Sequence, residues 1–392
     1  MLPFKYAGSN ADLSALADGL TDDIITGLSK FSYLRVIARS SSSRYGGQLV
    51  DVRVAGKEIG ARYVIEGTLR QAVGKLRLGV KLVDSATGAH LWAENFERTF
   101  SAEALFELQD DLVPRIVSTV ADMNGALPRS MSAAVRGRDP ERLTPYESVL
   151  RSFAYFEVYL PETLAQARTG LEAAVKKEPS YGDAWAMLAL LNVQDYAHSF
   201  DLRPDALVSG AAAARRAVEV APSNHLAHLA LAETYFFQKE VAGFQAAAER
   251  ALTLNPMDGN AVASIGEFFV LSGNAEHGMD LAGCAKRLNP NHPGRYWHAD
   301  FNNAYRKRDY RAAVDAALKS NLPGYFGTQA LLAAGYGQLG DLEAARKSLR
   351  ELTRLLPNVS SSIRQAAAKW FHPDHLEHFI EGLRKAGLEI RD

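Results

Sequence analysis

The sequence lacks most of the features that would mark a membrane protein or a familiar type of enzyme. Cys284 is the only cysteine among 392 residues, which excludes an intrachain disulfide framework and a cysteine-based zinc site. No stretch approaches the roughly 18–20 apolar residues of a membrane span, and the first residues do not read as a secretory signal. The net charge is −1, so no basic field is present to recruit nucleic acid. We therefore expect a cytoplasmic protein that binds no nucleic acid or membrane.

Prolines recur towards the C-terminus at a nearly constant step: Pro179, Pro222, Pro256, Pro290, Pro323 and Pro357. The intervals are 43, 34, 34, 33 and 34 residues. A repeat of this length predicts stacked helix–turn–helix units, which form a solenoid with an extended concave surface. Such a stack has no catalytic centre of its own, so the first hypothesis is binding. The long interval is explained by an insertion at 199–206.

Small and aromatic residues fill fixed places between these prolines. The unit that begins at His225 has small residues at Ala232, Ala248 and Ala251 and an aromatic residue at Tyr235. Small residues let two helices approach closely, and the aromatic residue fills the space between units. Residues 144–357 therefore resemble the tetratricopeptide family, with five to six units. The C-terminal segment 358–392 is expected to supply an amphipathic helix, over 372–388, that caps the last unit.

The first 126 residues show a different pattern, in which short strands alternate with amphipathic helices. The segment 75–85 places apolar residues on one face and charged residues on or near the other, as in a strand with one buried face. The apolar residues are Leu76, Leu78, Val80 and Leu82, and the charged ones are Lys75, Arg77 and Lys81. This order predicts an α/β domain, with helices packed against a mixed sheet that contains an antiparallel meander. We expect strands at 2–6, 34–40, 61–72, 75–85 and 89–98, and helices at 10–30, 51–59 and 101–124.

The segments 17–42, 51–71 and 82–98 resemble the TolB-like amino-terminal domain of bacterial signalling proteins. The resemblance covers nearly all of residues 2–124. It implies a domain that lies between an effector and a tetratricopeptide array, where the effector is a class III adenylate or guanylate cyclase or a winged-helix DNA-binding domain. The sequence begins inside the first expected strand, and no segment of it is assigned to such an effector.

Residues 127–143 separate the two expected domains. They are polar, contain two prolines and show no apolar period, which is typical of a linker.

Two short patterns resemble sites but fit the repeat better. Residues 335–340 match GxGxxG, but the match falls at the end of a repeat helix and its turn rather than between a strand and a helix. His372, His375 and His378 are spaced by three on the capping helix, which allows a metal-binding pair without a clear third ligand. We expect no catalytic residue, metal or cofactor.

The concave face of the array is the expected binding surface. Polar or large residues are expected to point inward from its first helices at Glu233, Phe236, Phe237, Asn260 and Glu267. The same positions are also where neighbouring units pack, so the pattern alone does not separate binding from packing.

Two functions of different classes remain. The first is a non-catalytic signalling module that binds a protein or peptide, with a homodimer left open. The alternative is the C-terminal part of a class III cyclase or of a winged-helix transcriptional regulator. Cyclase chemistry needs two metal-binding aspartates in a dedicated domain, and every segment of this sequence is already assigned elsewhere.

Overall fold

The computed structural model describes residues 1–6, 8–46, 50–72, 74–99, 105–200, 202–322 and 324–390. The chain divides into two compact units, Met1–Ala134 and Val135–Asp392. The first unit is an α/β domain and the second is an all-α solenoid of the tetratricopeptide type, which confirms the predicted fold class. The boundary between the units falls inside the predicted linker at 127–143.

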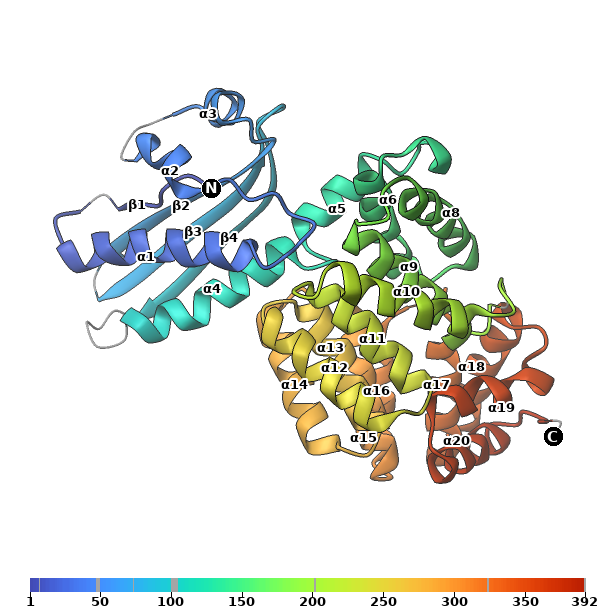
Figure 1. The fold of residues 1–392 in the computed structure, drawn as a ribbon. Coiled ribbons are helices and arrows are strands. Elements are labelled where there is room, and N and C mark those ends of the chain that lie inside the picture. Colours follow the sequence, from blue (N-terminus) through green and yellow to red (C-terminus); the bar gives the residue numbers. More distant parts are fainter. Residues whose placement is uncertain are drawn as a thin grey trace. The chain divides into compact units, whose positions relative to one another are not determined.

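The N-terminal unit is built on a four-stranded mixed sheet (Figure 1). Its strands β1 (Lys5–Tyr6), β2 (Tyr63–Ala72), β3 (Lys75–Asp84) and β4 (Ala89–Thr99) lie in that order across the sheet. β1 is parallel to β2, and the other three strands form an antiparallel meander, as predicted. The helices α1 (Ala11–Leu28) and α4 (Leu105–Ala121) pack side by side over one face.

The strand β3 shows why one face of the sheet is covered and the other is not. Leu76, Leu78 and Val80 on one face are buried. On the opposite face, Lys75 and Arg77 bind Glu97 of β4 at 2.6 and 2.7 Å. The period of two in the sequence therefore separates the core from the solvent.

The predicted strand at 34–40 is wrong. Residues 34–38 belong to no strand, and Arg39–Ser42 form the short helix α2. Arg39 binds Asp18 of α1 at 2.5 Å and also binds Asp22, so ion pairs hold this segment against a helix instead of a sheet edge. The next helix, α3 (Val52–Ile59), begins after the cap Asp51 and ends at Gly60, as predicted.

Part of the predicted linker is also regular. The helix α5 (Ala126–Ala133) occupies its first half, and Leu127 and Pro128 are buried. The proline that argued against a helix lies in the first turn, where its missing N–H group has no helical partner to lose. A 3-10 helix, η3, follows at Pro140–Arg142.

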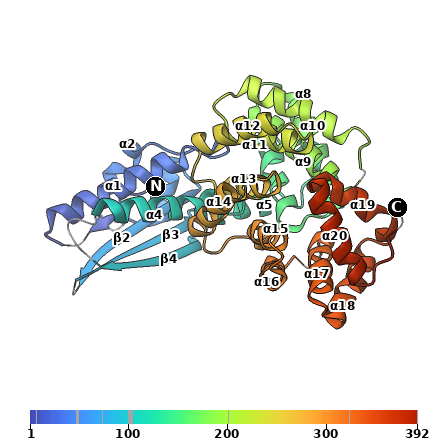
Figure 2. The same ribbon diagram turned by 90° about the horizontal axis from the view of Figure 1, so that it is seen from below.

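The C-terminal unit is a succession of antiparallel helical hairpins (Figures 1 and 2). The hairpins pair α6 (Pro145–Ser152) with α8 (Pro161–Lys177), α9 (Gly182–Ala197) with α10 (Ala206–Val220), α11 (His225–Phe237) with α12 (Val241–Leu254), α13 (Gly259–Leu271) with α14 (Ala275–Leu288), α15 (His298–Arg306) with α16 (Tyr310–Ser320), and α17 (Phe326–Leu339) with α18 (Leu342–Leu355). The short α7 (Tyr155–Val158) precedes α8, and the 3-10 helix η4 (Gly294–Trp297) precedes α15.

The spaced prolines mark the ends of the second helices. Pro222, Pro256 and Pro290 each lie two residues after the last residue of α10, α12 and α14, and Pro179 and Pro357 do the same after α8 and α18. Proline cannot continue a helix, so each repeat stops at the same place. Pro323 lies outside the described residues. In the hairpin of α9 and α10, the predicted insertion separates the two helices. Asp201 of this insertion lies outside the described residues.

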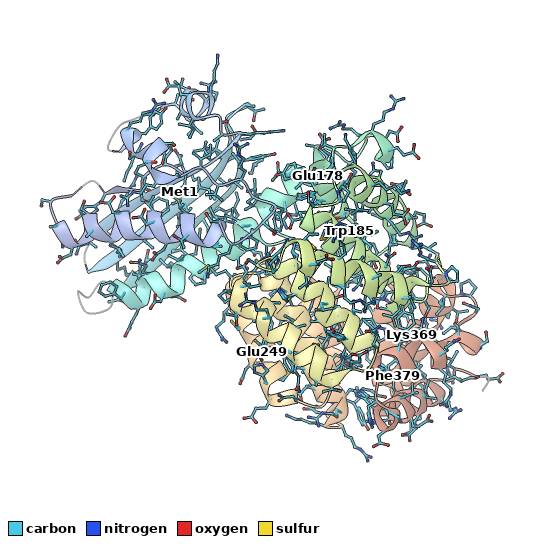
Figure 3. The ribbon with its side chains drawn as sticks, in the orientation of Figure 1. Met1, Glu178, Trp185, Glu249, Lys369 and Phe379 are labelled. Atoms are coloured by element: carbon cyan, nitrogen blue, oxygen red, sulfur yellow. The ribbon has the colours of Figure 1, made fainter. Side chains whose placement is uncertain are left out.

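Two helices follow the last hairpin. The helix α20 (Pro373–Lys385) packs on α17 through buried Phe379 and Leu383, where the capping helix was predicted. The helix α19 (Val359–Trp370) was not predicted, and it contacts α9 of an early hairpin. Figure 3 labels Lys369 on α19 and Phe379 on α20. Across the described part of the chain, no helix is long and apolar enough to cross a membrane.

Candidate functional site

The inner face of the helical unit contains a partly open cavity of about 120 Å³. Its walls come from the first helices of successive hairpins and from the C-terminal helices. Aromatic rings at Tyr159, Phe268, Phe326 and Trp370 form much of the lining. The polar side chains that line it are Gln194, His198, Ser264, Glu267, Arg295, His298, Asn302 and Tyr325.

A chain of hydrogen bonds crosses the unit beside this cavity. The hydroxyl of Tyr325 lies 2.9 Å from Nδ1 of His198, and Nε2 of His198 lies 2.9 Å from Oε1 of Gln194. The amide of Gln194 donates to Glu233 at 3.0 Å. The amide oxygen can only accept, so Nε2 of His198 carries a proton, and in the neutral ring Nδ1 accepts from the tyrosine. The hydrogen bonds are therefore satisfied by a neutral His198 protonated at Nε2.

Arg295 is the fixed positive charge of the cavity. It lies in η4, and only 8% of the residue is exposed. Its guanidinium donates to Oγ of Ser264 at 3.1 Å and to the side chain of Asn260. Both partners are neutral, and no partner within the described residues takes up Nε. The guanidinium is always charged, so the cavity carries a buried cation.

Glu267 of α13 supplies the carboxyl group among the described lining residues, and its contacts with neighbouring side chains are long. Asn302 Nδ2 lies 3.5 Å from Oε1 of Glu267, and His298 Nδ1 lies 3.7 Å from the same atom. Asn302 is buried, and its Oδ1 has no partner among the described residues. Nε2 of His298 likewise has none there. The hydrogen-bonding capacity of this wall is therefore only partly used.

Burial raises the pKa of both inner carboxyl groups. The pKa of Glu267 rises to about 8, because desolvation outweighs the attraction of Arg295. The pKa of Glu233 rises to about 7 through desolvation, against the hydrogen bond from Gln194 and the charge of Arg295. Both groups therefore exchange a proton near neutral pH.

Burial lowers the pKa of both inner histidines. The pKa of His198 falls to about 3, mainly by desolvation and further by His298 and Lys369. The pKa of His298 falls to about 4 by desolvation and by Arg295. Both rings are neutral at pH 7, which agrees with the hydrogen-bond chain through His198.

The C-terminal helices close the inner face. Trp370 donates from Nε1 to the carbonyl of Ala197 at 2.9 Å, and Lys369 donates to the carbonyl of Tyr196 at 2.7 Å. The ring of Trp370 packs on Phe237, with centroids 4.9 Å apart, and also on Phe268. The last helices therefore lie against the early hairpins, although more than 170 residues separate Trp370 from Ala197.

The structure separates the five predicted positions into two groups. Glu233, Asn260 and Glu267 face the polar interior, where Asn260 and Glu267 lie near Arg295 or the cavity. Phe236 and Phe237 instead pack with Phe244, Phe268 and Trp370 between the units and α19. Whether any of these positions binds a partner stays a prediction.

Several residues of the cavity were not predicted, among them His198, Arg295 and Tyr325. The sequence nevertheless contained a signal. His198 immediately precedes the insertion at 199–206, Arg295 lies in η4, and Tyr325 directly precedes α17. These three residues lie between repeat helices, whereas Glu233, Ser264 and Glu267 come from the regular first helices α11 and α13.

A larger, open cleft of about 990 Å³ lies beside the cavity. Lys239, Gly273 and Arg308 line it, and each is the residue at positive φ in the turn between the two helices of its hairpin. Phe236, Phe244 and Trp370 form part of its apolar floor. The repeat thus sets equivalent turns of three successive hairpins along one cleft.

The two patterns that resembled sites have packing roles. Gly337 and Gly382 allow α17 and α20 to approach, since a Cβ atom on Gly337 would lie 2.1 Å from the carbonyl oxygen of Gly382. Gly340 ends α17 at φ 77°, as a turn residue. His375 stacks on Phe371, and His378 contacts the hydroxyl of Tyr310 at 2.9 Å. Among the described residues, no three potential metal ligands come together.

Comparisons of the sequence find one family model and one relative that are similar to parts of this chain. Residues 1–115 match the family model described as "HilA/YgeH-like transcriptional regulator, second domain". A relative from Rhizobium meliloti (strain 1021), named "Putative adenylate cyclase 3", is 32% identical over 233 residues. The match covers 59% of this chain and 39% of that relative. The chain thus matches well under half of the length of that relative.

Solved structures with a similar arrangement of helices have low sequence identity. The structure of the human IFIT1 dimer with m7Gppp-AAAA is 12% identical in sequence and has a TM-score of 0.48. The alignment covers 97% of this chain and 85% of the IFIT1 chain. A chain of the APC/C hetero-tetramer Cut9–Hcn1 is 14% identical in sequence and has a TM-score of 0.45. The alignment covers 72% of this chain and 51% of that chain.

Proposed function

We propose that this chain is a non-catalytic regulatory module that binds a peptide segment of a partner protein in the open cleft of its helical unit. The observation that carries the proposal is the cleft itself, which has a volume of about 990 Å³ and an apolar floor. Grooves between helices commonly bind peptides through a few apolar anchors. The accessible apolar lining residues Val241, Trp370 and Leu376 would receive such anchors.

Charge at the rim favours an acidic peptide. Lys239, Arg306 and Arg308 line the cleft and are exposed. Of the acidic residues in the lining, Glu377 already binds Arg364, so Asp374 is the principal opposing charge. The excess of cations would attract carboxylates and fix the orientation of the bound segment.

The test begins with selection of peptides from a displayed random library on the full chain. The selected peptides are then measured by fluorescence anisotropy against the wild type and Arg308→Glu. We expect affinity to fall at least ten-fold in Arg308→Glu, and the selected peptides to be enriched in Asp or Glu next to an apolar residue. The control Arg311→Glu changes an exposed arginine on α16 outside the cleft and should bind as the wild type does. Equal binding by Arg308→Glu would place the peptide elsewhere.

A wider context is favoured by the comparisons. The N-terminal residues match a domain of transcriptional regulators, and the relative of R. meliloti is named a cyclase. Together with the resemblance of residues 2–124 to the TolB-like domain, this supports a cytoplasmic signalling protein whose output is a cyclase or a DNA-binding domain. The helical unit would then provide the regulatory input.

An enzymatic alternative is tested directly. The purified chain is incubated with ATP or GTP and Mn²⁺, and cyclic nucleotide is measured by chromatography. We expect none, because the described residues form an α/β domain and a helical solenoid, and none of them is assigned to the dedicated domain that cyclase chemistry needs. Formation of cyclic nucleotide in proportion to the protein concentration would overturn the non-catalytic proposal.

A further inference from the structure

The cavity contains a buried guanidinium group and a buried carboxyl group that do not pair with each other. Among the described residues, no carboxylate oxygen lies within 4.0 Å of the guanidinium of Arg295. Its hydrogen-bond partners are Ser264 and Asn260, which are neutral, and its Nε has no partner among those residues. A buried cation in this situation lacks the counter-charge that usually offsets the loss of water.

Glu267 is the complementary group on the same cavity. Its side chain is 15% exposed, and its contacts with Asn302 and His298 are 3.5 and 3.7 Å long. The histidine contributes no positive charge at neutral pH, because burial holds its pKa at about 4. The carboxyl group therefore also lacks a counter-charge on the protein.

The buried amide of Asn302 provides an independent sign of a missing occupant. Asn302 is only 3% exposed, it lines the cavity, and its Oδ1 has no partner among the described residues. Buried polar atoms in folded proteins are almost always hydrogen-bonded. A donor inside the cavity would complete the bonding of this side chain.

We propose that the cavity binds a small zwitterion, with its carboxylate at Arg295 and its ammonium group between Glu267, Asn302 and the ring of Tyr159. An ammonium group would donate to both Glu267 and Oδ1 of Asn302, and the faces of aromatic rings attract it further. A ligand with only one charge would leave either Arg295 without a counter-charge or the oxygens of Glu267 and Asn302 without an additional donor.

The size of the cavity limits the ligand. Its volume is about 120 Å³, somewhat less than the roughly 150 Å³ of an engineered cavity that holds benzene. A zwitterion of about five to seven non-hydrogen atoms, the size of the smallest amino acids, would fill it. This site goes beyond the proposed peptide cleft and does not depend on it. The two linings share Leu271, Trp370 and Phe371, but the polar groups that hold the zwitterion do not line the cleft.

The test is isothermal titration calorimetry on the full chain. The zwitterions are glycine, L-alanine, D-alanine, L-serine and β-alanine, and the controls are acetate, propionate and ethylamine, which carry one charge each. We expect at least one zwitterion to bind with 1:1 stoichiometry and at least ten-fold more tightly than every control. If no zwitterion binds, or if acetate binds as tightly, the inference is wrong.

Variants assign the binding to this cavity. Glu267→Gln has nearly the same shape and removes only the ability to ionise, so it should fold while its affinity for the zwitterion falls at least ten-fold. Arg295→Gln should lose binding too, with folding checked by circular dichroism. Glu276→Gln, on the exposed surface of α14, is the matched control and should bind normally. Unchanged affinity in Glu267→Gln would overturn the assignment. Peptide binding in the same proteins is measured separately, so failure here leaves the cleft proposal testable.

Discussion

At the scale of single residues, the interior of the helical unit is dominated by ionisable groups that burial keeps neutral or unpaired. The inner carboxyl groups bind protons more tightly than in water, and the inner histidines bind them more weakly. Desolvation is the largest cause in all four cases. Opposite shifts in acids and bases are what a water-poor site produces.

These shifts predict a fall in stability above pH 6.5. The pKa of Glu267 rises from 4.5 to about 8 and that of Glu233 to about 7, so the folded protein holds more protons than the unfolded chain. Stability therefore falls as pH rises through this range, by about 2 kcal/mol between pH 6.5 and 8. His198 and His298 act in the opposite direction, but only between about pH 3 and the unfolded pKa of 6.5.

Urea denaturation at pH 6.5 and 8 measures the effect. Glu267→Gln should lose most of the fall in stability between pH 6.5 and 8, and it should be more stable than the wild type at pH 8. Glu276→Gln should show the same fall as the wild type. A stability that stays level from pH 6.5 to 8 in the wild type would contradict the raised carboxyl pKa values.

At the scale of helices and turns, glycine sets how closely α17 and α20 pack. Gly337→Ala would bring a Cβ atom to 2.1 Å from the carbonyl oxygen of Gly382 and 2.8 Å from the backbone nitrogen of Ala386. Neither backbone atom can move without the whole helix, so we expect a loss of about 1–3 kcal/mol. Gly283→Ala is the control, since only the flexible end of Arg287 lies nearby. It should be neutral or stabilising by up to about 1 kcal/mol.

The turns along the cleft carry backbone strain. Arg308 adopts φ 62°, a region that favours glycine, and Lys239 does the same. Arg308→Gly should relieve this strain and stabilise the helical unit by about 0.5–1 kcal/mol while weakening peptide binding. Arg308→Gln should weaken binding equally without the gain in stability. Thermal denaturation with anisotropy separates the two effects, and equal melting temperatures would argue against strain.

The repeat period predicted most of the helices of the C-terminal unit. The elements that interrupt the repeat could not be predicted from the local sequence pattern. The hairpins from α9 to α14, the meander and the cap Asp51 were predicted because each depends on neighbours in sequence. The helix α2 was missed because Arg39 is held by acidic residues about twenty positions away. The groups of the cavity converge from five or more elements, and no local pattern records that convergence. The zwitterion site therefore required the structure.

At the scale of the helical unit as a whole, α19 converts an open stack into a closed one. Trp370 bridges to Ala197 by a hydrogen bond of 2.9 Å and to Phe237 and Phe268 by ring contacts. A solenoid normally transmits its interactions only to adjacent repeats. Closure instead couples the early and the last hairpins directly. A change at α19 should therefore alter the local stability of both.

Trp370→Ala tests this coupling by hydrogen exchange. Loss of the ring and its hydrogen bond should cost about 3 kcal/mol and speed the exchange of amides in α9 and α11 as well as in α19. Trp297→Ala is the matched control, because Trp297 contacts Lys286, Lys319 and His292 of its own neighbourhood. It should speed exchange only around η4, α14 and α16. If Trp370→Ala changed exchange in α19 and α20 alone, the early hairpins would be independent of the C-terminal helices. In that case the cavity would be a pocket of the last units rather than a property of the closed unit.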